Sequence, residues 1–280
     1  QAARAEAAGI RGVLPEVHDP DLRLDAVGAA LHRRGIELHP WIRPTFGVKD
    51  PVCRVLSDLE AQRRKFGTPL ARACLSNTAT LDRALSAMER FAEANRSALD
   101  GLHLDYVRND NALFLMHFPC QCPACQAERQ TWLGRGELRP EDMQNPCIAY
   151  KELRRRNDRI TGFVRRAREL TAARELKLSL AARANYLSLD DLWDPPVYGL
   201  GPAVFEGQDW AQWAADGLYD FICTMNYHTD PVRFEKVLQE HARLLAGTPA
   251  TFFCGLGVQS SMGACDAAAL EHLLAILGRE

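Results

Sequence analysis

The sequence of 280 residues has no long hydrophobic run and no excess of charge of either sign. Apolar stretches such as 247–258 are shorter than the ~20 residues that a membrane span requires, so we expect no membrane insertion. Lysine and arginine total 34 against 36 acidic residues, and this balance argues against a nucleic-acid partner. Residues 1–12 show no signal peptide, which leaves the localisation open.

The composition is that of an ordinary globular enzyme. It is 47% hydrophobic, 25% charged and 8% aromatic, which excludes a disordered, collagen-like or disulfide-scaffold protein. The nine cysteines are an odd number, so they cannot all form disulfides within one chain. No repeat or linker divides the sequence, and its length suits one α/β barrel, so we predict a single domain over 1–280 of unspecified oligomeric state.

Short apolar segments alternate with segments that have helical periodicity. The apolar segments predict parallel strands buried on both faces, because polar alternation is missing from most of them. Such repeated βα units imply a parallel sheet with right-handed crossovers. The predicted strands are 12–17, 36–42, 101–107, 177–182, 219–226 and 251–257, and the predicted helices are 2–9, 22–34, 80–98, 151–175, 208–216, 231–245 and 265–278.

Two features favour a (β/α)8 TIM barrel over a doubly wound sheet, which remains the alternative. No glycine-rich phosphate-binding turn follows the first predicted strand. Polar and aromatic residues instead gather just after the strands, where barrel active sites form. Because the chain opens and closes in predicted helices, we expect the barrel to lack its first and eighth strands here, as in a fragment of a longer protein.

The segment 99–108 carries a specific motif, Leu-Asp-Gly-Leu-His-Leu-Asp-Tyr-Val-Arg. It resembles the fourth-strand motif D-G-[IL]-H-x-D-Y-[IV]-R of glycosyl-hydrolase-like proteins related to family 10. Residues 35–44 resemble the third strand of those proteins, 208–210 with 220–227 their sixth helix and strand, and 255–257 their seventh strand. The resemblance implies a TIM-barrel glycosidase-like domain that acts on carbohydrate or binds it.

Asp105 is the candidate catalytic carboxylate. It ends a buried strand, where an ionised carboxylate is costly unless it is paired or functional. A structural salt bridge to Arg108 or Arg183 is the alternative interpretation. Hydrolysis of an O-glycosidic bond in an oligo- or polysaccharide requires two carboxyl groups flanking that bond. We expect Asp105 to be one of them, as the nucleophile or the general base.

The second carboxyl group is less clearly marked. In the similar chitinase strand, D-G-x-D-x-D-x-E, the proton donor falls at the position of Val107, so the chitinase mechanism is not predicted. Glu16 directly follows a strand and is our first candidate, ahead of Asp19, Asp230 and any acid on an eighth strand. The missing glutamate also motivates an alternative function, a catalytically inactive carbohydrate-binding barrel.

Residues around the predicted strand ends suit sugar recognition. Trp41 and Tyr106 can stack on the apolar face of a pyranose, although aromatic residues more often belong to the core. His39 and His103 share the faces of Trp41 and Asp105 and could orient the carboxylate. The side chains that we expect to bind sugar hydroxyl groups are Arg43, Arg108, Arg183, Asn185, Asn226, Tyr227 and His228.

A cysteine cluster follows the predicted fourth strand. Cys120, Cys122 and Cys125 form a C-x-C-x-x-C pattern that can wrap one tetrahedral zinc ion together with a fourth ligand. The pattern resembles that of family 42 β-galactosidases, and this resemblance implies a structural zinc with Cys74 as the upstream ligand. Cys147 is the alternative fourth ligand, and disulfides or free thiols are the alternatives to a metal site.

Overall fold

A computed structural model describes residues 2–49, 73–109, 120–184, 203, 206–260 and 263–279. Helices and strands alternate along the chain, as predicted. The strands are β1 (Gly12–Val13), β2 (Glu37–Leu38), β3 (Trp41–Ile42), β4 (Gly101–Leu104), β5 (Lys177–Arg183), β6 (Phe221–Met225), β7 (Thr251–Cys254), β8 (Gln259–Ser260) and β9 (Gly263–Ala264). The helices are α1 (Ala2–Ala7), α2 (Asp25–His32), α4 (Thr78–Ala94), α6 (Pro123–Leu133), the short 3-10 helix η1 (Pro140–Gln144), α7 (Pro146–Ala172), α9 (Trp210–Ala215), α10 (Pro231–Leu245) and α11 (Ala267–Leu277).

The central sheet is parallel and follows the chain order β3-β4-β5-β6-β7. β1 pairs with β2 in parallel, and a bridge between Glu16 and Trp41 continues this pairing to β3. Each new strand therefore adds to the same side, as in a barrel, whereas a doubly wound sheet reverses direction. The fold is a partial (β/α)8 barrel, and the doubly wound alternative is wrong.

The predicted strand 36–42 is divided into β2 and β3 by His39 and Pro40. Proline has no N–H to donate, which explains an interruption of the ladder at this point. Hydrogen bonds to the neighbouring strand nevertheless continue through the break. Leu38 O accepts the N–H of Asp100, just before β4, at 3.1 Å, and Pro40 O accepts that of His103 in β4 at 3.0 Å. The two short strands therefore occupy one strand position of the barrel.

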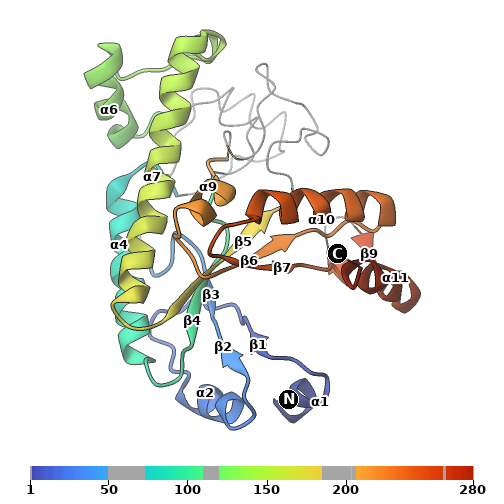
Figure 1. The fold of residues 1–280 in the computed structure, drawn as a ribbon. Helices are drawn as coiled ribbons and strands as arrows, with labels where there is room; N and C mark the ends of the chain where they lie inside the picture. The colour runs from blue at the N-terminus through green and yellow to red at the C-terminus, as the bar shows by residue number, and fades with distance from the viewer. Residues whose placement is uncertain are drawn as a thin grey trace.

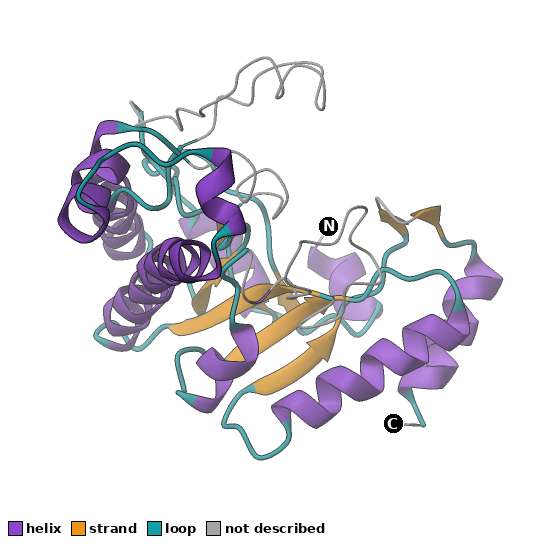
Figure 2. Ribbon diagram, turned by 90° about the horizontal axis from the view of Figure 1, so that it is seen from above, coloured by secondary structure: helices purple, strands orange, loops and turns teal. Residues whose placement is uncertain are grey.

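Helices cover the outside of the strands (Figures 1 and 2). α4 packs against α7, and α10 packs against α11 at the other end of the sheet. The long α7 extends well beyond the sheet, and α6 lies beside its far end (Figure 1). No helix in the described part of the chain is long and apolar enough to cross a membrane.

The alternation of side chains along the strands determines which residues enter the hydrophobic core. Leu102 and Leu104 on β4 are 0% and 1% exposed and belong to the apolar cluster beneath the helices. Leu178 and Leu180 on the neighbouring β5 are in the same cluster. Successive side chains on a strand point to opposite faces, so Gly101, His103 and Asp105 must face the barrel interior.

The helix α6 was absent from our sequence-based expectations. Its apolar periodicity is weak, since only Cys125 and Arg129 of its residues are buried. Two local signals mark it, however. Pro123 occupies its first turn, and Gly134 ends it in the left-handed conformation, with φ of 76°.

Gly28→Ala should destabilise the protein. A Cβ atom at Gly28 in α2 would lie 2.7 Å from the backbone of Ala98, which cannot rotate away. We expect a loss of about 1–3 kcal/mol in the free energy of unfolding, measured by denaturant titration. Gly162→Ala in α7 is the matched control, because nothing lies within 4 Å of its Cβ position. This change should add about 0.5–1 kcal/mol, and equal effects at both positions would contradict the packing argument.

Candidate active site and metal centre

Asp105 lies at the carboxyl end of β4, on the interior face of the barrel. Its backbone N–H donates to Ile42 O at 3.0 Å, and its Oδ1 accepts the backbone N–H of Tyr106 at 2.6 Å. Burial raises the pKa of the Asp105 carboxyl group, although the Tyr106 N–H, Arg108 and Arg43 act in the opposite direction. A carboxyl group with a raised pKa in this position is suited to donating a proton.

Tyr106 directly follows Asp105 and adopts an unusual backbone conformation. Its φ of 56° lies in the left-handed region, which non-glycine residues rarely adopt and which often occurs at functional sites. Its ring centre lies 4.6 Å from the Arg43 guanidinium, 4.8 Å from that of Arg108 and 6.4 Å from the ring of Trp41. Tyr106 is 41% exposed, so Trp41 and Tyr106 present an accessible aromatic surface beside the carboxyl group.

Glu16 reaches the same edge of the sheet through Arg43. Glu16 Oε1 lies 2.9 Å from Arg43 Nη2 and 3.1 Å from His18 Nε2. The Arg43 guanidinium also lies over the Tyr106 ring, so Arg43 links the Glu16 carboxylate to the aromatic pair of Trp41 and Tyr106. Arg43 and His18 are thus the ion-pair partners of Glu16 among the described residues.

Glu206 is a carboxylate that the sequence analysis missed. Its Oε2 lies 3.3 Å from Arg183 Nε and 3.7 Å from Arg108 Nε, and its side chain is 6% exposed. Arg108 Nη1 lies 3.7 Å from Asp105 Oδ1, so one guanidinium stands between two carboxyl groups. Arg108, one of the two predicted salt-bridge partners of Asp105, lies close to it, although its 3.7 Å distance is long for an ion pair. The other predicted partner, Arg183, pairs with Glu206 instead.

Gln208 fixes the segment that carries Glu206. Its Oε1 accepts the backbone N–H of Arg183 at 2.8 Å, and its Nε2 donates to Ala181 O at 3.1 Å and to Val107 O at 3.4 Å. The side chain thereby joins β5 to the end of β4. The acidic residue before Gly207, next to the Gln208-Asp209-Trp210 motif, was the one signal in the sequence for this arrangement.

The remaining predicted sugar-binding residues lie after β6, apart from Asn185, which is outside the described residues. Asn226 is buried, and its Nδ2 donates to Phe234 O in α10 at 3.0 Å. His228 is also buried, at 4% exposure. Burial raises the pKa of Tyr227, and the charge of Asp105 raises it further, which places this hydroxyl group in the electrostatic field of the carboxylate.

The two interior histidines have other partners than Asp105. His103 Nδ1 lies 2.8 Å from Ser179 Oγ, and burial lowers the pKa of His103 to about 3, so its ring is neutral. His39 Nε2 lies 2.8 Å from Glu37 Oε2. Gly101 makes room for this ring, because a Cβ there would lie 2.5 Å from His39 Nδ1. Both histidines therefore pack the interior below the site.

The four-cysteine site consists of Cys74, Cys120, Cys122 and Cys125, which are all buried. Their sulfur atoms lie within 4.8 Å of one another, and Cys74 Sγ is 3.7 Å from Cys125 Sγ. A tetrahedron with Zn–S bonds of about 2.3 Å places its sulfurs about 3.8 Å apart, so this donor set fits one metal ion. Hydrogen bonding from Cys120 lowers the pKa of Cys122 to about 7, which favours a thiolate. The exposed Cys147 is not part of the cluster.

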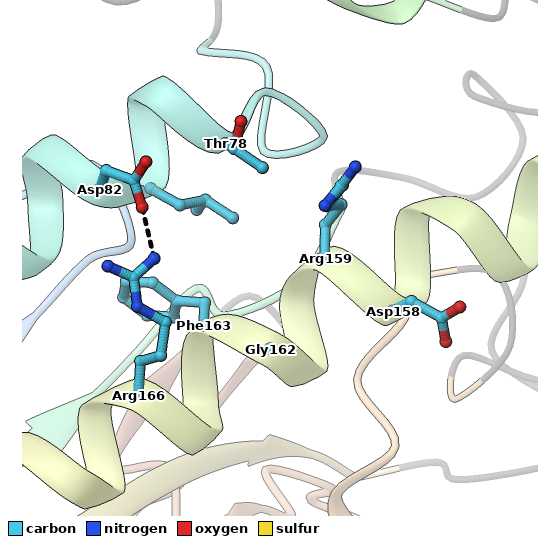
Figure 3. Close-up of a pocket in the computed structure, with 8 residues that line it drawn as sticks. Thr78, Asp82, Asp158, Arg159, Gly162, Phe163 and Arg166 are labelled. Atoms are coloured by element: carbon cyan, nitrogen blue, oxygen red, sulfur yellow. Dashed lines mark hydrogen bonds and ion pairs between the residues drawn. The ribbon is translucent and has the colours of Figure 1, made fainter. Parts of the chain in front are cut away.

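A separate cavity of about 150 Å³ lies between α4 and α7, outside the barrel (Figure 3). Arg166 at its edge forms an ion pair with Asp82, and Arg159 pairs with Glu128. Its arginines are therefore already neutralised by acidic partners. The cavity is distant in the fold from the strand ends that carry Asp105, and we do not assign it to the active site.

The solved structures most relevant to this arrangement are glycoside hydrolases. The glycoside hydrolase domain of PgaB (BpsB) from Bordetella bronchiseptica superposes with a TM-score of 0.65 at 17% identity, covering 94% of this chain and 76% of that one. The chain therefore shares the (β/α)8-barrel fold of that domain.

Two further structures agree with this assignment of the fold. The catalytic domain of β-amylase from Paenibacillus polymyxa gives a TM-score of 0.57 at 6% identity, over 99% of this chain and 85% of that one. The endo-1,4-β-D-mannanase from Thermotoga petrophila gives 0.50 at 11% identity, over 99% and 79%. No protein-family profile and no curated protein matches the sequence.

Asp105→Asn should stabilise the folded protein at neutral pH. Burial raises the pKa of Asp105 in the folded state, so ionisation of this group destabilises the fold once the pH exceeds that pKa. We expect a higher melting temperature for the variant near pH 8, and a gain that shrinks toward about pH 4, as measured by calorimetry. Asp158→Asn is the control, since the Asp158 side chain is 70% exposed. A loss of stability for Asp105→Asn at every pH would contradict the inferred cost of the buried charge.

Proposed function

We propose that this chain is the catalytic domain of a glycoside hydrolase, with Asp105 as a catalytic carboxyl group. The observation that carries the proposal is the position of Asp105, partly buried with an 18% exposed side chain at the carboxyl end of β4 in a glycosidase-type barrel, beside an exposed aromatic surface. Active sites of such barrels lie at this end of the strands. The substrate class is an oligo- or polysaccharide with O-glycosidic bonds.

Asp105 acts as the general acid in this proposal, in place of the nucleophile or general base expected from the sequence, because its pKa is raised. Its raised pKa keeps a proton available for the oxygen of the leaving group, and the aromatic surface of Trp41 and Tyr106 stacks on an adjacent sugar ring. Arg43 and Arg183 lie where they can donate hydrogen bonds to sugar hydroxyl groups. The motif of 99–108, which resembles that of proteins related to family 10, supports the same assignment.

Two residues are candidates for the second carboxyl group, Glu16 and Glu206. We favour Glu206 because it shares Arg108 with Asp105, and two arginines at 3.3 and 3.7 Å stabilise its ionised form. A carboxylate that stays ionised beside a protonated one provides the division of roles that glycoside hydrolysis needs. Glu16 is the less favoured candidate because Arg43 and His18 already engage its Oε1.

A carbohydrate-binding barrel without activity is the second candidate. It is favoured by Val107, which is fully buried at the position where the chitinase strand carries its proton donor. The two candidates differ in one measurable respect, since a binding protein would retain a sugar without hydrolysing it.

Asp105→Asn should lower kcat roughly 10²–10⁴-fold, as expected for the loss of a general acid. The measurement is hydrolysis of a panel of aryl glycosides and polysaccharides by the full-length protein. Asp158→Asn, an exposed carboxylate on α7, should leave the rate unchanged. Undiminished hydrolysis by Asp105→Asn would remove this residue from the mechanism, and binding without turnover by the wild-type protein would favour the inactive barrel.

We also propose that the four-cysteine site binds a structural zinc ion, as its resemblance to the cluster of family 42 β-galactosidases implies. Four thiolates complete a tetrahedral shell and leave no position for water or substrate. The ion would join α6 to the segment that precedes α4, since Cys122 and Cys125 lie at the start of α6 and Cys74 lies just before α4.

Purified protein should contain about one zinc ion per chain. Cys122→Ser and Cys74→Ser should lose it and unfold at a lower temperature, because metal binding contributes to folding. Cys147→Ser should retain the metal, since this exposed thiol lies outside the cluster. Elemental analysis with thermal unfolding tests this, and a metal that persists in Cys74→Ser but disappears in Cys147→Ser would reassign the fourth ligand.

A further inference from the structure

A buried ionic cluster of Arg129, Glu152, Arg155 and Arg156 joins α6 to α7. Arg129 Nε and Nη2 donate to the two oxygens of Glu152 at 3.2 and 2.9 Å, and both side chains are 0% exposed. Arg155 Nε and Nη2 donate to the same oxygens at 3.2 and 2.8 Å. Arg155 Nη2 also lies 3.6 Å from Cys125 Sγ. The buried ionic cluster therefore contacts the four-cysteine site directly.

Arg156 differs from the other members of the cluster. It is 2% exposed, and none of its three guanidinium nitrogens has a hydrogen-bond partner in the described part of the chain. Glu152, the carboxylate of the cluster, is already shared by Arg129 and Arg155. A buried cation without a partner is costly unless an opposite charge lies nearby. Burial lowers the pKa of Arg156, as do the charges of Arg155 and Arg129, whereas the charge of Glu152 and, to a smaller extent, that of Cys125 act in the favourable sense.

The charges of the two neighbouring groups are complementary. Arg155 also pairs with Glu128, which Arg159 neutralises in turn. Four arginines against two glutamates therefore give the buried ionic cluster, together with this outer pair, a formal charge of +2. A divalent ion bound by four thiolates carries a formal charge of −2. The two charges cancel in a region from which water is largely excluded. A monovalent ion would leave one excess negative charge there, and a trivalent ion one excess positive charge.

We propose that Arg155 and Arg156 are positioning residues of the four-cysteine site, whose charges make it selective for a divalent ion held by four thiolates. This inference rests on the metal site proposed above and adds to it the residues that lie behind the cysteine ligands. Arg155 supplies a hydrogen bond to the Cys125 sulfur, and Arg156 supplies charge without a directed hydrogen bond. Residues behind the ligands of metal sites commonly hold and tune them in this way.

The position of Cys122 reinforces the argument. It is the N-cap residue of α6, a helix of 11 residues, so the positive end of the helix dipole lies at the thiolates. The helix dipole acts from α6, and Arg155 and Arg156 act from α7. Both favour negative charge on the sulfur atoms.

The test is metal binding by the full-length protein and its Arg156→Met variant, which keeps a long side chain and removes the charge. Metal-free, reduced protein is titrated with Co²⁺, whose thiolate absorption bands report four-sulfur coordination, and Zn²⁺ affinity is measured by chelator competition. We expect Arg156→Met to raise the Kd for Zn²⁺ about 10–100-fold with the same spectrum. Arg156→Lys should recover part of the affinity. Arg154→Met, an exposed arginine on the same helix, is the control and should bind as the wild type does.

A second measurement separates charge compensation from ordinary packing. Without metal, the negative charge left near Arg156 is that of Glu152, which Arg129 and Arg155 already share, so Arg156→Met should leave the melting temperature of the metal-free protein unchanged or raise it. With Zn²⁺ bound, the same variant should melt at a lower temperature than the wild type. A residue needed only for packing would lower both temperatures. If Arg156→Met is insoluble, Arg156→Gln replaces it with the same expectations.

Two outcomes would overturn the proposal in distinguishable ways. If the wild-type protein gives no thiolate bands with Co²⁺ and no binding of Zn²⁺, the metal site itself fails, and the role of the arginines fails with it. If the wild type binds both ions and Arg156→Met binds Zn²⁺ with equal affinity, the metal site stands and the charge-compensating role is wrong.

Discussion

The burial of Leu102 and Leu104 against the helices is the constraint on which the candidate active site depends. Because side chains alternate along β4, these two leucines force His103 and Asp105 to face the barrel interior. The parallel pairing of His103 with Trp41 and with Ser179 then fixes β4 between β3 and β5. A shift by one residue would bury Asp105 beneath the helices, so the hydrophobic core and the site specify the same register.

The sequence predicted the features that depend on local pattern. All six strand positions, the order of βα units and the placement of Asp105 follow from apolar runs and a short motif. The division at Pro40 and the helix α6 were not predicted, although Pro40, Pro123 and Gly134 are local signals for them. The apolar periodicity of α6 is weak, because its buried side chains are Cys125 and Arg129 rather than an apolar face.

Glu206 is a site residue that the sequence alone does not place near Asp105. It lies about one hundred residues from Asp105 along the chain, and only the folded barrel places both carboxyl groups beside Arg108. The fourth cysteine of the metal site is a similar case. Spacing alone left Cys74 and Cys147 as alternatives, and the fold brings Cys74, which three residues separate from α4, to the other three sulfurs. Both sites are therefore assembled by packing of elements that the sequence predicts one at a time.

The backbone N–H of Tyr106 has a stereochemical consequence for Asp105. It donates to Oδ1, and Arg108 Nη1 lies 3.7 Å from the same oxygen. The N–H dipole and the guanidinium charge make Oδ1 the poorer site for a proton, so the acid form carries its hydrogen on Oδ2. One hydrogen bond and one neighbouring charge thereby make the two carboxyl oxygens chemically distinct. They determine from which of the two oxygens a proton leaves.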